Sequence, residues 1–319
     1  MIRIAVLDDY QGVALRLADW KSLHPDAQIE AFPEHIADID TLAKRLHAFE
    51  CVVLMRERTP LPRVLIEKLP NLKLVITTGM QNASVDAAAL AERGIVFCGT
   101  EGVGSPTSEL AWGLMLSMLR GITREDRAIR QGRWQTTMGY GAQGKTLGII
   151  GLGRLGSMMA KYANAFGMEA LAWSRSLTDE RAAARGAKRV EKDELFARSD
   201  VVTIHVNLND SSRNLVGAAD LARMKPTAYL INTSRAPIVD QAALIAALKA
   251  RRIAGAAIDV FDVEPVGKEH PLFELDNVVL TPHLGYVIEE NLRAGYANAV
   301  ENIRAFLDGK PINLVKPRS

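Results

Sequence analysis

Cysteine is scarce in this chain, and neither of the two cysteines belongs to a recognisable motif. Cys51 and Cys98 each lie within an apolar run, which indicates buried, unpaired thiols. The sequence has no CxxC spacing and too few cysteines to build a disulfide framework. This pattern is usual for proteins of a reducing cytoplasm, so we expect a cytoplasmic protein.

Long apolar runs are absent as well. The longest uncharged apolar stretch of note, residues 110–119, is far shorter than the about 20 residues that a membrane-spanning helix needs. We interpret it as a helix in the core. Residues 1–10 predict a strand followed by acidic side chains rather than a signal peptide. We therefore expect no association with a membrane.

The charge shows no excess of either sign. The chain has 39 basic and 37 acidic residues and a formal net charge of +2, which argues against a nucleic-acid-binding protein. No pair of histidines has the spacing of metal ligands on a helix, so we expect no zinc or other metal. The histidines that we interpret as isolated are His24, His35, His47 and His270.

Short Val- and Ile-rich runs alternate with helical patterns along the 319 residues, a length that suggests about two domains. The alternation predicts βαβ units and a parallel sheet. The expected strands are 2–9, 51–56, 72–79 and 95–99 in the first half, and 146–150, 169–173, 201–206, 228–234, 256–260 and 277–281 in the second. A long helix is expected through 110–130. A last helix at 289–309 needs a packing partner, and a return to the first domain would supply it.

The motif GLGRLG at 151–156 follows a predicted strand and opens a predicted helix. In G-x-G-x-x-G spacing, Gly151 allows a tight turn, Gly153 lets the backbone approach a pyrophosphate, and Gly156 lets the helix pack against the strand. The helix N-terminus then favours the negative charge of the dinucleotide. We predict that the loop, including Arg154 and Leu155, binds NAD or NADP.

The next predicted strand, 169–173, lacks the acidic residue that usually binds the ribose 2′-hydroxyl of NAD. Ser174, Arg175 and Ser176 stand in its place. Arg175 can pair with the 2′-phosphate of NADP. It can instead stack over the adenine, which leaves NAD possible. The sequence thus gives NADP a slight preference over NAD.

Three polar residues follow strands of the second half. Arg235 follows 228–234, Glu264 lies a few residues after 256–260, and His283 follows 277–281. In parallel sheets ligands bind beyond the carboxyl ends of the strands. A guanidinium can hold a carboxylate, an imidazole can give a proton to a carbonyl oxygen, and a carboxylate can orient the imidazole. Together, these three side-chain types predict the reversible reduction of a 2-keto acid to a 2-hydroxy acid.

The segments INTSRAPIVD (231–240), AAIDVFDVEP (256–265) and TPHLG (281–285), with GLGRLG, resemble the signature blocks of the D-isomer-specific 2-hydroxyacid dehydrogenases. With residues 78–95, the resemblance covers nearly the whole chain. It implies that Arg235, Glu264 and His283 are the catalytic set. It also implies a homodimer in which the cofactor domain forms much of the contact.

The resemblance further implies an α/β fold of two Rossmann-like, doubly wound parallel-sheet domains. The cofactor domain would be inserted in a discontinuous substrate domain. We expect residues 1–100 and 286–319 to form the substrate domain, and residues 101–285 to form the dinucleotide-binding domain. Small polar keto acids, such as hydroxypyruvate and glyoxylate, are the substrates that the family commonly handles.

Other positions gain roles only through the resemblance. The backbone of Gly79, Met80 and Gln81 would bind the substrate carboxylate together with Arg235 and His283. Asp259 would lie near the nicotinamide carboxamide, and Thr107 near the cofactor phosphates. The remaining expected cofactor contacts are Ser174, His205, Val206 and Thr233. Two departures are Ala236, where the family usually has glycine, and Asn207, where it usually has proline.

Several alternatives remain open at this point. Dinucleotide-sensing corepressors share this fold and a similar triad, and turnover would distinguish them from an enzyme. A phosphoglycerate dehydrogenase without a regulatory domain is a second alternative, because the sequence ends at 319. Arg56, after 51–55, could contact a second anionic group of the substrate or be a surface residue. Asp8, Asp9 and Tyr10 could reach the substrate or form an ordinary turn.

Overall fold

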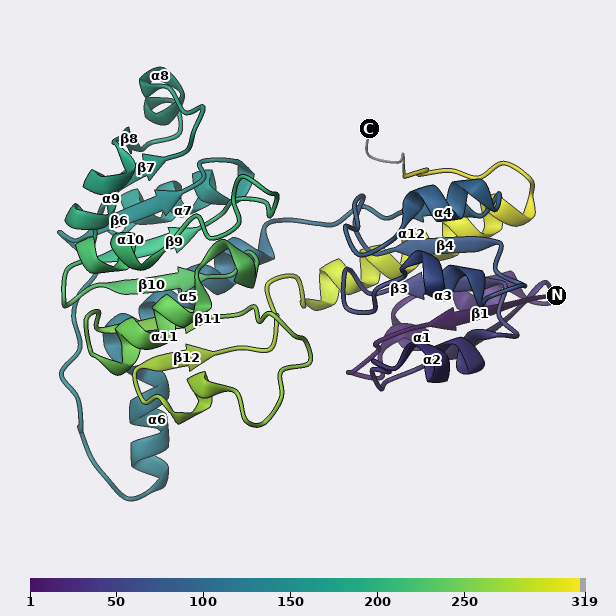
Figure 1. Cartoon of the computed structure of the whole chain (residues 1–319), viewed down its shortest axis with the longest axis horizontal. Helices are drawn as coiled ribbons and strands as arrows, with labels where there is room; N and C mark the ends of the chain where they lie inside the picture. Colours follow the sequence, from purple (N-terminus) through teal and green to yellow (C-terminus); the bar gives the residue numbers. More distant parts are fainter. Residues whose placement is uncertain (316–319) are drawn as a thin grey trace. The chain divides into compact units, whose positions relative to one another are not determined.

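All pairings between the named strands are parallel in the computed structural model, which describes residues 1–315. The strands form two separate sheets in two compact units (Figure 1). Unit 1 contains Met1–Gly104 and the segment from Ile288 onward, and unit 2 contains Ser105–Val287. The predicted fold class, two α/β domains with parallel sheets, is confirmed.

Unit 1 has a five-stranded sheet in the order β2-β1-β3-β4-β5. Its strands are β1 (Ile2–Val6), β2 (Ala27–Ala31), β3 (Cys51–Leu54), β4 (Leu74–Thr77) and β5 (Val96–Gly99). Its α-helices are α1 (Ala14–Leu17), α2 (Ile39–Leu46), α3 (Arg63–Glu67), α4 (Ala87–Glu92) and α12 (Glu289–Leu307). The last helix packs against α1 and β4. It is fixed there by Asn302, whose Nδ2 donates to the Gly99 carbonyl at 2.8 Å.

Unit 2 has a seven-stranded sheet in the order β12-β11-β10-β9-β6-β7-β8. Its strands are β6 (Thr146–Ile150), β7 (Glu169–Trp173), β8 (Lys188–Arg189), β9 (Val201–Ile204), β10 (Tyr229–Asn232), β11 (Gly255–Ile258) and β12 (Val278–Leu280). From β6 the chain adds β7 and β8 on one side. It then crosses back and adds β9, β10, β11 and β12 on the other side. This reversal creates a switch point beside β6, where ligands of such sheets bind.

Helices cover both faces of the unit 2 sheet (Figure 1). They are α5 (Pro106–Arg120), α6 (Ile122–Arg130), α7 (Arg154–Ala165), α8 (Asp179–Ala183), α9 (Lys192–Arg198), α10 (Ala218–Arg223) and α11 (Gln241–Lys249). Two apolar clusters result, one containing residues of α9, α10 and α11 and the other residues of α5, α7 and α8. Because both faces are covered, central strands such as β9 and β11 are buried throughout.

One expected element needs correction, and two strands were not predicted. The helix expected through 110–130 is two helices, because Gly121 adopts a left-handed φ of +65° that ends α5. The strand β2 was not predicted, because it is an edge strand in which Gln28 and Glu30 interrupt the apolar pattern. The strand β8 was not predicted because it has only two residues. In the part of the chain that the structure describes, no helix is long and apolar enough to cross a bilayer.

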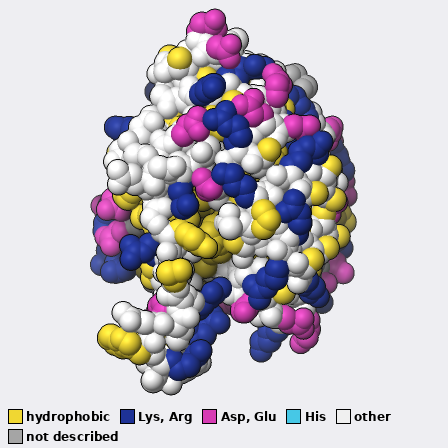
Figure 2. Space-filling view, turned by 90° about the vertical axis from the view of Figure 1, so that its left-hand side faces the viewer, with side chains coloured by type: hydrophobic (Ala, Val, Ile, Leu, Met, Phe, Trp, Pro, Cys, Tyr) yellow, Lys and Arg dark blue, Asp and Glu magenta, His cyan; other side chains and the backbone are white. Residues whose placement is uncertain are grey.

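Helix α6 and the segment after it form the projection at the bottom of Figure 2, where apolar side chains are exposed. The exposed fractions are 54% for Ile122, 53% for Ile129, 75% for Trp134 and 90% for Met138. Side chains of this kind are seldom so exposed together unless another surface covers them.

Candidate active site

The glycine-rich loop has the local geometry that its spacing predicts. Gly151 has a φ of +90°, and a Cβ there would lie 2.6 Å from the His205 carbonyl oxygen. A Cβ on Gly156 would lie 2.0 Å from the carbonyl oxygen of Gly151, so only glycine fits at the start of α7. A Cβ on Gly153 would meet nothing within 4 Å. The loop therefore leaves open space beside exposed backbone, which fits the approach of a dinucleotide pyrophosphate.

Two arginines lie in the segment after β7. Arg175 is exposed, and its guanidinium donates to the Ser211 carbonyl oxygen in the loop after β9. Arg181 donates from Nη1 to the Ser176 carbonyl oxygen at 2.9 Å. Arg181 was not a predicted site residue, because it lies in α8 and outside any motif. The region next to Ser174 thus carries two cations that are held by backbone oxygens.

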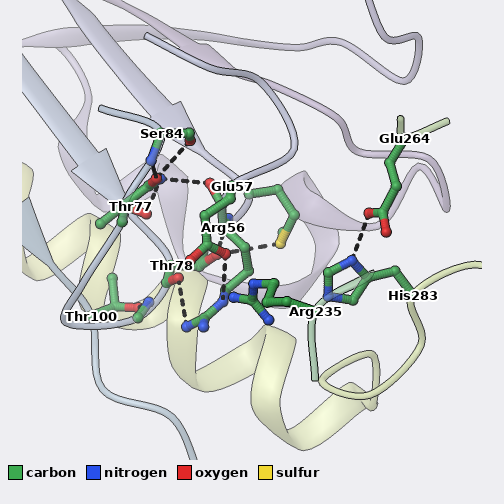
Figure 3. A network of polar contacts seen from close by, with 12 residues as sticks. Arg56, Glu57, Thr77, Thr78, Ser84, Thr100, Arg235, Glu264 and His283 are labelled. Atoms are coloured by element: carbon green, nitrogen blue, oxygen red, sulfur yellow. Dashed lines mark hydrogen bonds and ion pairs between the residues drawn. The ribbon is translucent and has the colours of Figure 1, made fainter. Parts of the chain in front are cut away.

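Arg235, Glu264 and His283 come from the loops after β10, β11 and β12, three neighbouring strands of unit 2. His283 Nδ1 lies 2.6 Å from Glu264 Oε2, and the side chains are 15% and 20% exposed (Figure 3). The other carboxylate oxygen of Glu264 accepts the Phe261 N–H at 2.9 Å. Glu264 is thus held by its own loop and orients the imidazole through Nδ1.

A buried carboxylate shapes the loop that carries His283. Asp259 has no exposed surface, and its Oδ1 accepts the Thr281 hydroxyl at 2.6 Å and the Leu284 N–H at 2.7 Å. Its Oδ2 accepts the Gly285 N–H at 2.9 Å. Burial raises the pKa of the Asp259 carboxyl, and these hydrogen bonds oppose the rise. Asp259 therefore holds the Thr281 side chain before His283 and the backbone directly after it.

Two further contacts reach the same loop. The Thr107 hydroxyl, on the first turn of α5, donates to the Gly285 carbonyl oxygen at 2.7 Å. The ring of Tyr286 meets the His283 ring edge-on, with centroids 5.8 Å apart. Tyr286 was not a predicted site residue, since an aromatic residue after the Leu-Gly pair has no distinctive pattern.

His205 and Val206, expected at the cofactor site, pack against the glycine-rich loop. A Cβ on Gly151 would lie 2.6 Å from Val206 Cγ1. His205 Nε2 lies 2.8 Å from the Thr203 hydroxyl. Its Nδ1 and the Thr233 hydroxyl are buried and have no hydrogen-bond partner within residues 1–315. Burial lowers the pKa of the His205 imidazole to about 4, so this ring is neutral at physiological pH.

In unit 1, the expected carboxylate-binding loop lies against Arg56 (Figure 3). Gly79 has a φ of +101°, and a Cβ there would lie 1.9 Å from Arg56 Nη1. The same Nη1 donates to the Thr78 carbonyl oxygen at 3.3 Å. Met80 and Gln81, which follow, are exposed. The structure therefore brings a guanidinium beside the Gly79 backbone.

The aspartates after β1 form local structure. Asp9 is 3% exposed, and its carboxylate accepts the N–H groups of Val13 and Ala14 at 2.9 and 3.0 Å, which caps α1. Asp8 is 2% exposed and accepts the Thr59 hydroxyl at 2.7 Å. Of the two open interpretations of these aspartates, the contacts favour an ordinary turn at the end of a strand.

Comparisons with known proteins agree with these features. The family model for the D-isomer specific 2-hydroxyacid dehydrogenase NAD binding domain matches residues 112–285. A glyoxylate reductase of Thermococcus litoralis is 41% identical over 263 residues, which cover 79% of each chain. A D-3-phosphoglycerate dehydrogenase of Archaeoglobus fulgidus is 37% identical over 86% of this chain, which spans about half, 52%, of that protein. The solved structure of a phosphoglycerate oxidoreductase from Vibrio cholerae has a TM-score of 0.92 at 35% identity, covering 97% of this chain and 100% of the other.

Burial of His205 predicts a loss of stability in mild acid. Its pKa in the folded protein is about 4, below the ordinary 6.5. The stability that the neutral imidazole contributes to the free energy of unfolding is therefore complete above pH 6.5 and is lost as the pH falls toward 4. The His205→Gln variant keeps a partner for Thr203 but does not titrate. We expect its free energy of unfolding to fall less than that of the wild type between pH 7.5 and 4.5, by up to about 3 kcal/mol. Urea titrations at several pH values measure this difference.

His47 is the matched control, because it is an exposed histidine. The His47→Gln variant should follow the wild-type pH dependence. Equal pH dependence in the wild type and His205→Gln would contradict the assignment of a neutral, buried imidazole.

Proposed function

The chain belongs to the D-isomer specific 2-hydroxyacid dehydrogenases, a family of oxidoreductases, and from this premise we propose that it interconverts a small 2-keto acid and its D-2-hydroxy acid with NAD(P). The observation that carries the proposal is the 2.6 Å contact between His283 Nδ1 and Glu264 Oε2, with Arg235 on the loop of the adjoining strand. We propose that unit 2 binds the dinucleotide and that unit 1 is the substrate domain.

In this proposal His283 is the acid–base group. With Nδ1 bonded to Glu264, the Nε2 proton is given to the carbonyl oxygen of the keto acid during reduction, and is taken back in the reverse direction. Glu264 keeps the ring in one orientation and stabilises its positive charge. Bound NAD(P)H supplies the hydride. Arg235 of unit 2 is proposed to bind the substrate carboxylate. Within unit 1, the backbone N–H groups of residues 79–81 are proposed as carboxylate-binding groups.

The residues proposed to hold the dinucleotide are on unit 2. The loop 151–156 receives the pyrophosphate, since Gly153 has open space beside it. Thr107, His205, Val206, Thr233 and Asp259 are proposed as supporting positions around the cofactor. The contacts of Thr107 and Asp259 with the His283 loop suggest that these two act chiefly by holding that loop.

The substrate is proposed to be hydroxypyruvate or glyoxylate. The similarity to a glyoxylate reductase supports this class. A specific observation also favours a second candidate, a phosphoglycerate dehydrogenase. The Arg56 guanidinium beside Gly79 is a cation that a second anionic group of the substrate could use.

The proposed activity predicts turnover of a small 2-keto acid. Loss of reduced-nicotinamide absorbance should follow the addition of glyoxylate or hydroxypyruvate, and the His283→Ala variant should lower kcat by about 10²–10⁴-fold. The dissociation constant for the dinucleotide should stay within about twofold, because His283 acts on the keto acid. The matched control is His47→Ala, which removes an exposed histidine and should keep the wild-type rate.

Three other results would change the proposal. A wild-type rate in His283→Ala would contradict the acid–base assignment. Turnover of phosphorylated hydroxypyruvate far above that of hydroxypyruvate would favour the phosphoglycerate candidate. Dinucleotide binding without turnover of any of these acids would favour a dinucleotide sensor.

We propose a slight preference for NADP, on the basis of Arg175. Removing the guanidinium in Arg175→Ala should raise the dissociation constant for NADPH about tenfold, the effect of one charge-assisted hydrogen bond worth about 1.5 kcal/mol. The constant for NADH should change less than about twofold. Fluorescence titrations of both cofactors measure the two constants.

Arg198 is the control for this variant, because it is an arginine of unit 2 that pairs with Glu194 and with Glu169 at the amino end of β7. An equal loss for both cofactors in Arg175→Ala would instead support stacking of the guanidinium over the adenine.

We also propose a homodimer that covers α6 and the segment after it, since Ile129, Trp134 and Met138 are exposed there. The Trp134→Asp variant should sediment as a monomer at micromolar concentration, where the wild type sediments as a dimer, because a buried charge without a partner is costly. Leu15→Asp places the same charge on an exposed apolar side chain of unit 1 and should leave the dimer intact. A wild type that sediments as a monomer would refute the proposal.

A further inference from the structure

The glycine-rich loop is held from outside its own motif by an arginine. Arg185 lies in the turn after α8, and its Nη1 donates to the carbonyl oxygen of Leu152. Leu152 lies between Gly151 and Gly153, so the guanidinium contacts the central peptide of the loop. No sequence motif includes Arg185, which stands 33 residues after Leu152.

The backbone that carries Arg185 is itself fixed to the elements around the loop. Gly186 has a φ of +72°, and its carbonyl oxygen accepts Asn164 Nδ2 of α7 at 2.8 Å. Ala182 and Ala187, on either side of this turn, are buried in the same apolar cluster as Leu152. The guanidinium therefore starts from an anchored turn and is not on a freely moving segment.

Holding the Leu152 carbonyl fixes the direction of the next N–H. The peptide bond is planar and trans, so the C=O and the N–H that it joins point to opposite sides. The Gly153 N–H thus faces away from Arg185. It donates to no acceptor within residues 1–315, and a Cβ on Gly153 would meet nothing within 4 Å. A cation on the carbonyl oxygen also polarises the amide and makes its N–H a stronger donor.

From these contacts we infer that Arg185 is a positioning residue for dinucleotide binding, which acts through the Leu152–Gly153 peptide on the phosphate-binding N–H of Gly153. The inference rests on the proposed function, since it needs unit 2 to bind a dinucleotide. It assigns to Arg185 an effect on the affinity for ligands that contain a pyrophosphate, and none on the proton transfer at His283.

The test compares Arg185→Ala with a matched control, Arg252→Ala. Arg252 also donates to backbone carbonyls of unit 2, those of Met224 and Ala222, but it contacts α10 and its end, not the glycine-rich loop. Dissociation constants for NADH and for ADP-ribose are measured by calorimetry on the whole chain. NADH is used because it lacks the 2′-phosphate proposed to contact Arg175.

We expect Arg185→Ala to raise both constants five- to tenfold and Arg252→Ala to leave them within twofold. Hydrogen exchange of the free protein should become faster over residues 151–156 in Arg185→Ala alone. At saturating cofactor, the kcat of Arg185→Ala with glyoxylate or hydroxypyruvate should equal that of the wild type.

Unchanged constants in Arg185→Ala would overturn the inference, and so would weaker binding without faster exchange at 151–156, because the peptide would then not be the route of the effect. Equally weakened binding in Arg185→Ala and Arg252→Ala would also overturn it, because the effect would then reflect a general loss of stability. If the wild type bound neither NADH nor ADP-ribose, the proposed function itself would fail, which is a different result from a loss of binding in Arg185→Ala alone.

Discussion

Parallel pairing in unit 2 places the carboxyl ends of its strands at one edge of the sheet, and the candidate site depends on this constraint. Residues far apart in the sequence, such as Gly151, Arg235 and His283, follow strands that belong to one sheet. The sheet can be parallel only because helices cover both faces and each strand returns through a crossover. The chemistry at this edge therefore depends on the apolar patterns of the strands and helices that build the sheet.

The edge alone does not give the imidazole its orientation. That comes from hydrogen bonds within two loops, in which Glu264 holds the ring and Asp259 holds the backbone around it. A buried carboxylate with a raised pKa is costly unless several donors surround it, and three donors of the His283 loop do so here. The loop and Asp259 thus stabilise each other, which allows a carboxyl group to be buried directly after β11.

Much of this arrangement could be predicted from the sequence, because periodic apolar runs and the glycine spacing report backbone requirements directly. Gly151 and Gly156 are examples, since a backbone carbonyl oxygen lies too close for a Cβ at each position. The edge strand β2 was missed because Gln28 and Glu30 interrupt its apolar pattern, and the break at Gly121 was missed because periodicity does not record a left-handed φ. Arg185, Tyr286 and the role of Asp259 as a support for a loop depend on contacts between distant segments. Arg235, Glu264 and His283 were predicted from their positions after strands, and their roles stay predictions.

Left-handed backbone at residues other than glycine marks the ends of three strands. Asp8 follows β1 with a φ of +58°, Arg56 follows β3 with +54°, and His283 follows β12 with +55°. Such a conformation costs a non-glycine residue about 1 kcal/mol or more, and persists only where surrounding contacts enforce it. Glycine would remove the strain but also the side chain. For Asp8 the side chain has a structural use, because its carboxylate binds Thr59. For His283, the hydrogen bonds that Thr281, Leu284 and Gly285 donate to Asp259 hold the strained loop in place. The sequence therefore retains the imidazole at a position where the backbone alone would favour glycine.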